Sequence, residues 1–484
     1  MQAIDFNNSY AALPEVFFAR QPPVAVASPA LIKLNDSLAQ SLGLDADFLA
    51  SENGIAMLSG NVVPDGADPI AMAYAGHQFG NWVPQLGDGR AILLGEVIDK
   101  QGIRQDIQLK GAGRTPFSRG GDGRNWLGPV LREYVISEAM AMLGVPTTRS
   151  LAAVSTGEFV FREAAMPGAI LTRVARSHVR VGTFQYFVAR NNIDAIKTLT
   201  EHVIARHYPE AAESENAALA LLQNVVIAQA QLVAHWQSIG FIHGVMNTDN
   251  CSISGDTIDY GPCAFMDTFE AAKVFSSIDV MKRYAYQNQP RVAQWNVMNL
   301  AQCLLDLLHE DKDIGIELAQ EAINSFEDHF IAAYTNRMRA KLGLLEESDD
   351  DLELITDLLA TMESGKLDFT ISFRTLATRK DLDTDIFAEN GMLGTWHSRW
   401  QQRLSLESHD AVRAQQLMRS SNPAIIPRNH QVEAMINAAI AGDFSPFETL
   451  NKALQNPFDV EHDSSELAAA PLASELVTQT FCGT

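Results

Sequence analysis

The sequence predicts an α+β fold of two lobes, with a strand-rich N-terminal lobe and a helical C-terminal lobe that continues into a helical extension. Between about residues 83 and 175, short runs of β-type residues alternate with Gly-rich turns. From about residue 190 onward, apolar residues recur at helical spacing instead. We therefore expect an N-terminal extension over 1–60, the strand-rich lobe with nucleotide-binding loops over 61–187, and the helical lobe with its extension over 188–484.

The strand-rich lobe contains three clear β-type runs, at 90–97, 106–110 and 169–173. One helix interrupts them at about 130–143, and Gly144 with Pro146 beyond it gives a strong stop signal. The helical lobe opens with an Ala-, Leu- and Gln-rich helix at about 216–238. Further helices are expected near 296–310, 312–342, 350–363, 408–419, 430–441 and 446–455.

The charge of the chain excludes several classes of partner. The 484 residues carry a formal net charge of −23, which argues against a duplex DNA or RNA binder and against an anionic membrane surface. The segment from Arg90 to Arg180 differs, because its 13 Lys and Arg against 8 Asp and Glu give a local balance of +5. A basic segment in an acidic protein favours a site for a small anion.

Cysteine usage and the N-terminus indicate the compartment. The four cysteines are widely spaced and include no Cys-x-x-Cys pair, which fits a reducing compartment and gives no zinc or iron–sulfur framework; they are Cys251, Cys263, Cys303 and Cys482. No apolar run approaches the roughly 20 residues that span a bilayer, and the N-terminus resembles no signal or transit peptide. We expect a soluble, cytoplasmic protein.

The first candidate motif is Gln85-Leu-Gly-Asp-Gly-Arg90, flanked by β-type sequence. Gly87 and Gly89 would let the backbone approach a phosphate, and Arg90 would add positive charge. The third glycine of a G-x-G-x-x-G loop is absent, because Ile92 stands there. A tight hairpin turn is therefore an equally good interpretation of this motif.

The second candidate is Lys110, at the end of a β-type run, with Glu133 on the following helix. Protein kinases pair a strand lysine with such a helix glutamate, although a surface Lys and a solvated Glu are the simpler alternative. The loop from Lys110 to Arg124 holds four basic residues and five glycines, a composition suited to a polyphosphate. Within it, Asp122 and Gly123 are expected to hold the loop or to meet another part of a nucleotide.

The third candidate is the segment with Arg173, Arg176 and Arg180, which suits a buried strand poorly unless an anion faces it. Bidentate Arg–phosphate pairing would explain these residues, and so would ordinary surface ion pairs. By contrast, His77 in Tyr74-Ala-Gly-His-Gln-Phe-Gly80 is expected to lie in an aromatic-glycine packing turn.

The most informative segment is His243-Gly-Val-Met-Asn-Thr-Asp-Asn250, followed by Asp259-Tyr-Gly261. Protein kinases place H-R-D-x-x-x-x-N after a long helix and then D-F-G, so the sequence predicts a protein-kinase-like two-lobed fold. Asn250 and Asp259 would supply oxygen ligands for Mg²⁺. Val245 occupies the position of the kinase base and cannot accept a proton, which makes Asp249 the nearest substitute carboxylate. A loop and hairpin with incidental acids is the alternative.

In this order, the motifs resemble the selenoprotein O (SelO) family. The matching stretches lie within about 74–267 and include YAGHQFGNWVPQLGDGRAILLGE, LKGAGRTPFSRGGDGR, LREYVISEAMAMLGVPTTRSLAAV, LTRVARSHVRVGTFQYF and HGVMNTDNCSISGDTIDYGP. The resemblance implies a pseudokinase-like protein that binds ATP in a flipped orientation and transfers AMP to Ser, Thr or Tyr hydroxyls of proteins, releasing pyrophosphate. It also implies Mg²⁺ as cofactor, and UMP transfer from UTP in bacterial members when Mn²⁺ is present.

The same resemblance assigns roles to individual residues. The residues that match the family's nucleotide-binding positions are Gly87, Gly89, Arg90, Lys110, Asp122, Gly123, Arg173, Arg180 and Asp259. Asn250 and Asp259 match the metal ligands, Asp249 matches the proposed proton acceptor, and Glu133 matches the glutamate that holds the lysine. With the nucleotide flipped, the α-phosphate would lie beside the metal and the attacking hydroxyl, and the cations would neutralise the departing pyrophosphate.

One departure from the family concerns redox control. Some members carry a Cys in the loop after D-Y-G that pairs with a Cys or selenocysteine near the C-terminus. Cys482 matches the latter, but the loop Lys273–Asp279 contains no cysteine and Cys263 is offset, so the resemblance does not extend to redox gating here. Two rival functions remain from the sequence: a kinase that transfers the γ-phosphate, and a non-catalytic nucleotide-binding module that regulates a partner.

Overall fold

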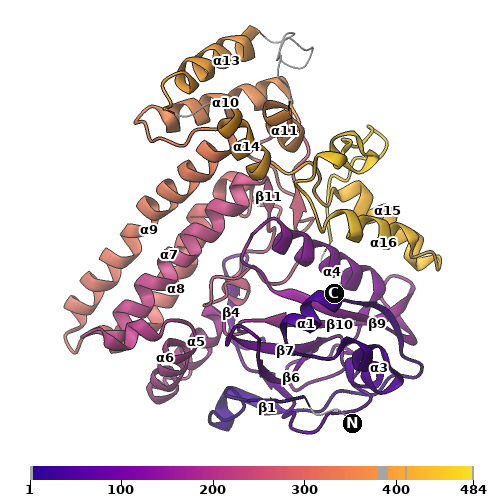
Figure 1. Cartoon of the computed structure of the whole chain (residues 1–484). Coiled ribbons are helices and arrows are strands. Elements are labelled where there is room, and N and C mark those ends of the chain that lie inside the picture. Colours follow the sequence, from indigo (N-terminus) through magenta and orange to yellow (C-terminus); the bar gives the residue numbers. More distant parts are fainter. Residues whose placement is uncertain (1–3, 379–390, 409–410, 482–484) are drawn as a thin grey trace.

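The structure, a computed structural model, describes residues 4–378, 391–408 and 411–481. It is a mixed α and β protein with one large antiparallel sheet (Figure 1). The sheet runs in the order β1-β3-β6-β7-β10-β9-β2, with β8 beside β10. Its strands are β1 (Phe18–Arg20), β2 (Ala30–Leu34), β3 (Ile70–Met72), β6 (Ala91–Ile98), β7 (Arg104–Lys110), β8 (Asn125–Trp126), β9 (Arg149–Phe161) and β10 (Ala165–Ala175).

The three β-type runs expected from the sequence form β6, β7 and β10, at the centre of this sheet. The longest strand, β9, was not predicted, because its buried centre is built from small residues such as Ala152 and Ala153. The segment 1–60 supplies β1 and β2, which pair with β3 and β9. The sheet therefore depends on strands from both sides of residue 60.

Helix α4 (Leu127–Met142) covers one face of the sheet and is buried along nearly its whole length. Figure 1 shows it between the sheet and the helices α15 (Asn429–Ile440) and α16 (Ser445–Ala453). The rings of Tyr134 and Phe447 meet edge to face, with their centres 5.7 Å apart. A helix buried along nearly its whole length needs such cover on every side. This burial fixes the position of Glu133, which α4 carries.

The helical part agrees with the expected helices to within a few residues at most ends. The helices in this part are α5 (Val181–Val188), α6 (Ile193–His207), α7 (Ala217–Ser238), α8 (Gln289–Leu308), α9 (Lys312–Lys341), α10 (Asp351–Gly365), α11 (Phe369–Thr378), α13 (Gly391–Leu404) and α14 (Ala411–Ser421). Several helices were not predicted from the sequence, namely α5, α6, α11, α13 and the short N-terminal helices α1 (Asp36–Ser41), α2 (Ala46–Ala50) and α3 (Glu52–Leu58). Residues 409 and 410, at the start of one expected helix, lie outside the described residues.

Within the described residues, α7 is the one helix long and apolar enough to cross a membrane by length and composition. More than half of the apolar stretch of α7, 56 %, is buried inside the protein, where α7 packs along α8 and α9. Burial in the core of the helical part explains its apolar sequence.

Two small two-stranded sheets accompany the large one. The hairpin β4 (Gly76–Gln78) and β5 (Asn81–Val83) follows β3, and the strand pair β11 (Phe241–Ile242) and β12 (Ala264–Phe265) brackets the loop that carries Asp249. Beyond β12, the segment Phe275–Ser277 pairs with Thr480: the Thr480 N–H donates to the Phe275 carbonyl at 2.7 Å, and the Ser277 N–H donates to the Thr480 carbonyl at 3.1 Å. The neighbouring Cys482 lies outside the described residues.

Candidate active site

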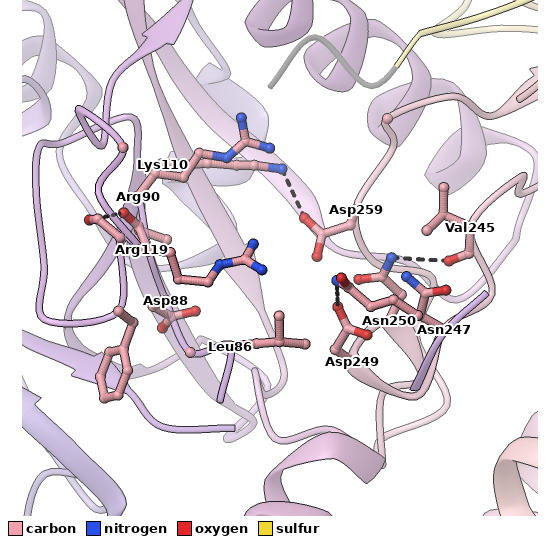
Figure 2. A pocket seen from close by; sticks show the side chains of 18 of the residues that line it. Leu86, Asp88, Arg90, Lys110, Arg119, Val245, Asn247, Asp249, Asn250 and Asp259 are labelled. Atoms are coloured by element: carbon pink, nitrogen blue, oxygen red, sulfur yellow. Dashed lines mark hydrogen bonds and ion pairs between the residues drawn. The ribbon is translucent and has the colours of Figure 1, made fainter. Parts of the chain in front are cut away.

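A cavity of about 450 Å³ lies between the large sheet and the loop from Val245 to Asp259. Eleven of the sequence-predicted site residues line it, namely Gly87, Gly89, Arg90, Lys110, Asp122, Gly123, Arg173, Arg180, Asp249, Asn250 and Asp259. Figure 2 shows Arg90 and Lys110 on one side of the cavity, Asp249 and Asn250 on the other, and Asp259 between them. The remaining predicted residue, Glu133, is not among the lining residues but forms an ion pair with Lys110.

Strand β7 and helix α4 bring Lys110 and Glu133 together. The Lys110 Nζ lies 2.6 Å from Glu133 Oε2 and 2.8 Å from Asp259 Oδ1. Arg173, from β10, donates to Glu133 Oε1 through Nε at 2.9 Å and through Nη2 at 2.7 Å, and its Nη2 also lies 2.5 Å from Asp259 Oδ1. Two cations and two carboxylates thus form one network, buried except for the Asp259 side chain, which is 23 % exposed, and each charge in it has a partner.

Arg180 connects this network to the opposite wall of the cavity. Its Nη1 donates to the Asp249 carbonyl at 2.9 Å and lies 3.4 Å from Asp259 Oδ2, while the guanidinium stacks 4.4 Å above the Tyr74 ring. Burial alone would raise the pKa of Asp259, but Arg173, Lys110 and Arg180 together hold that pKa well below its usual range. Asp259 is therefore an anion surrounded by three cations.

The motif Gln85–Arg90 forms a loop that packs on the following Gly-rich loop. A Cβ on Gly87 would lie 2.3 Å from the Phe117 ring, and one on Gly89 would lie 2.8 Å from the Phe117 carbonyl oxygen. Glycine is therefore needed at both positions for the two loops to pack together. Arg90 ends this loop, and it forms no ion pair with any carboxylate in the part of the chain that the structure describes.

Asp122 and Gly123 both stabilise the Gly-rich loop itself. The Asp122 carboxylate accepts two hydrogen bonds from Arg162, at 2.8 and 3.0 Å, and this hydrogen bonding lowers the pKa of Asp122. Gly123 has a φ of +68°, and a Cβ there would lie 2.1 Å from the Gly113 carbonyl oxygen. Of the two alternatives left open by the sequence, the contacts favour the one in which these residues hold the loop.

The loop after β11 carries the candidate base. Asp249 is 7 % exposed, and burial raises its pKa to about 6 even though a hydrogen bond from Gln78 acts in the opposite direction. The Gln78 Nε2 donates to Asp249 Oδ2 at 3.1 Å, whereas Oδ1 has no hydrogen-bond partner among the described residues. The position of the kinase base is Val245, which lines the same cavity. Asp249 is thus the carboxylate on this loop that combines a place in the cavity wall with an oxygen left without a hydrogen-bond partner among the described residues.

The hairpin β4–β5 holds this loop in place through three bonds that the sequence analysis did not predict. Besides the Gln78 bond, the His77 N–H donates to Thr248 Oγ1 at 2.7 Å and the Phe79 N–H donates to Asn247 Oδ1 at 2.9 Å. The His77 ring packs against Trp82 and Trp295, as expected of a packing turn. The turn nevertheless has a second role, because three consecutive hairpin residues bind three consecutive residues of the loop.

The oxygens of Asn250 and Asp259 are chemically suited to a divalent cation. The Asn250 Nδ2 donates to the Val245 carbonyl at 3.0 Å, so the side-chain amide is oriented by its nitrogen and its oxygen remains available. In the described residues, no group of three or more His, Cys, Asp or Glu side chains could hold a metal ion. Two protein oxygens fit Mg²⁺ when substrate phosphates and waters complete its shell.

Comparison with known proteins agrees with these motifs. A family model described as "Protein adenylyltransferase SelO" matches residues 1–455. A protein nucleotidyltransferase YdiU of Rhodopseudomonas palustris (strain HaA2) is 58 % identical over 486 residues, covering 99 % of both chains. Another, from Bradyrhizobium diazoefficiens, is 57 % identical over 485 residues with the same coverage. By the extent of the family match and the identity to these relatives, the chain belongs to the SelO family.

Proposed function

We propose that this protein transfers AMP from ATP to Ser, Thr or Tyr hydroxyls of other proteins and releases pyrophosphate. The family model is described as a protein adenylyltransferase, and the curated relatives are named protein nucleotidyltransferases. The cavity suits a nucleoside triphosphate, because seven Lys and Arg side chains line it against four Asp. The seven cationic residues are Arg90, Lys110, Arg119, Arg124, Arg162, Arg173 and Arg180.

We further propose that the chain has a protein-kinase-like arrangement of two lobes, divided near residue 187. The Lys110–Glu133 pair between strand and helix supports this proposal, and so does the loop with His243, Asn250 and Asp259. In this arrangement the cavity lies where the two lobes face each other. The hairpin β4–β5 belongs to the first lobe and binds the catalytic loop of the second.

The proposed reaction begins with a proton transfer. The acceptor hydroxyl gives its proton to Asp249 Oδ1, which has no other partner among the described residues, while the hydroxyl oxygen attacks the α-phosphorus. The bond between the α-phosphorus and the bridging oxygen to the β-phosphate breaks, and pyrophosphate leaves with that oxygen. Lys110, Arg173 and Arg180 stabilise the negative charge that moves onto the leaving group.

Asn250 and Asp259 would hold the divalent cation, Mg²⁺ or Mn²⁺. Such an ion polarises a phosphoryl oxygen and neutralises developing charge when it is bound. Asp259 already lies within reach of three cationic side chains, and the β- and γ-phosphates would compete for those same cations. The family resemblance also suggests that the protein transfers UMP from UTP when Mn²⁺ is present. A parallel transfer assay with UTP and Mn²⁺ tests this part of the proposal.

The observation that carries the proposal is that the loop has no carboxylate at the position of the kinase base but has one four residues later. Val245 stands where a kinase has its base, whereas Asp249, four residues later, lines the cavity and has an oxygen, Oδ1, without a hydrogen-bond partner among the described residues. The test uses ATP labelled separately at the α- and γ-phosphates, with transfer to protein as the readout. We expect label from the α-phosphate only. Incorporation from the γ-phosphate only would support a kinase, and no incorporation with intact ATP binding would support a non-catalytic module.

A further inference from the structure

A second hollow, of about 570 Å³, adjoins the nucleotide cavity between the segment after Ser277 and the start of α8. We name it the acceptor groove, and its main lining residues are Phe79, Ile278, Val280, Met281, Arg291 and Trp295. Phe79 and Ile278 line both the groove and the nucleotide cavity, so the two hollows are direct neighbours. Because Phe79 follows Gln78, which binds Asp249, the groove starts beside the candidate base.

The lip of the groove exposes apolar side chains to an unusual degree. Val280 is 84 % exposed, Met281 is 88 % exposed and Ile278 is 61 % exposed, all within four positions of the chain. A cluster of exposed apolar residues beside a cavity is a feature of binding surfaces. No described part of the chain covers these three side chains.

The segment that carries these residues is held in a fixed shape. The Asp279 carboxylate accepts the N–H groups of Arg283 at 2.9 Å and Tyr284 at 2.8 Å, and the Tyr284 hydroxyl donates to Asn247 Oδ1 at 2.7 Å. Thr480 pairs with the residues just before it. A surface that is already ordered loses less conformational entropy when a partner binds.

The charge of the groove is positive although the protein is strongly acidic. Arg283 stacks 4.6 Å above the Trp295 ring, and neither Arg283 nor Arg291 forms an ion pair with a carboxylate of the described residues. The one carboxylate that lines the groove, Asp279, is engaged by backbone N–H groups. A chain with a net charge of −23 thus presents unpaired cations beside its candidate active site.

We propose that this groove binds the protein acceptor, as an extended segment in which an acidic and an apolar side chain lie within a few positions of the modified hydroxyl. The apolar side chain packs on Val280 and Met281, and the carboxylate faces Arg283 and Arg291. This inference rests on the proposed function, because it names the class of acceptor for that reaction. The unpaired arginines select an acidic partner by charge complementarity, and the shared lining residues place that partner next to the nucleotide cavity.

The test uses two synthetic Ser-centred peptides of 15 residues that share one Leu and differ only in carrying Glu or Lys beside it. Their binding to the full chain is measured by fluorescence anisotropy, which does not require catalysis. We expect the Glu peptide to bind about ten-fold more tightly than the Lys peptide. Substitution of the exposed Arg291, Arg291→Glu, is expected to abolish this preference. The double variant Val280→Ser and Met281→Ser is expected to weaken the binding of both peptides about equally.

The control is Lys100→Glu, an exposed charge reversal in the turn at the other end of β6 and β7 from the cavity, which should leave the preference unchanged. Equal binding of the two peptides, or an unchanged preference in Arg291→Glu, would overturn the inference. So would a change of oligomeric state in the Val280 and Met281 variant with no change in peptide binding, since the groove would then join two copies of the chain. Failure of α-phosphate transfer with an intact Glu preference would instead count against the proposed function alone.

Discussion

The substitution Asp249→Asn removes the proposed proton acceptor and keeps the shape of the side chain. In the wild-type protein, Gln78 Nε2 donates to Asp249 Oδ2 at 3.1 Å. The side-chain carbonyl oxygen of the new Asn can accept the same hydrogen bond, so the loop should keep its position. The amide nitrogen then replaces Oδ1, the oxygen without a described partner, and it cannot accept a proton. Loss of a general base lowers a rate by about 10²- to 10⁴-fold, or ~3 to 5 kcal/mol in the barrier.

The assay is a single-turnover measurement of α-phosphate label on protein at saturating ATP, with calorimetric ATP binding and thermal unfolding measured alongside. We expect the transfer rate to fall by that factor while ATP affinity stays within a few-fold, because the Asp249 carboxylate forms no ion pair with a Lys or Arg of the described residues. Wild-type transfer by the variant would show that another group accepts the proton. An equal loss of ATP binding and transfer would instead assign Asp249 to binding.

Three further predictions follow from contacts at and beyond the cavity. In steady-state assays, Gln78→Met should lower the transfer rate about ten-fold and leave the KM for ATP little changed, because one hydrogen bond to a charged group contributes ~1.5 to 3 kcal/mol. A rise in KM alone would contradict this. Asp259→Ala should abolish the gain in ATP affinity that Mg²⁺ gives in calorimetry but keep binding in EDTA, and a persistent Mg²⁺ effect would exclude Asp259 as ligand. Burial lowers the pKa of Lys341 to about 7, so the free-energy cost of burying this side chain is absent above the unfolded pKa near 10.5 and complete below pH 7. Lys341→Met should therefore raise the free energy of unfolding, measured with urea, by a few kcal/mol at pH 7 and by less at pH 10. Equal gains at the two pH values would refute this reasoning.

The elements that could be predicted from the sequence are those with local signals. Helix α4 was expected at about 130–143 and runs from Leu127 to Met142, because Gly144 and Pro146 mark its end. Strand β9 has no such signal, since small residues such as Ala152 and Ala153 favour no strand by themselves. Its pairing with β2 and β10 determines its conformation, and pairing partners are not visible in a local pattern.

The candidate site shows the same division. The spacing of Asn250 and Asp259 and the Lys110–Glu133 pair could be predicted, because each belongs to a motif that occurs in kinases. The bond from Gln78 to Asp249 joins residues 171 positions apart, and the bond from Arg162 to Asp122 joins residues 40 positions apart. Contacts of such sequence separation arise from the fold, so sequence reasoning assigned neither partner.

The pairing of Thr480 with the segment Phe275–Ser277 has a consequence for the order of folding. The Thr480 hydroxyl also donates to the Pro262 carbonyl at 2.6 Å, across 218 positions of the chain. Contacts between residues so far apart in the chain form late, because the closure entropy is lost before the contacts stabilise the fold. After dilution from denaturant, the tryptophan signal of the core should therefore recover before nucleotide transfer does. The interval between them would measure how long the segment Phe275–Ser277 remains unpaired after the core has formed.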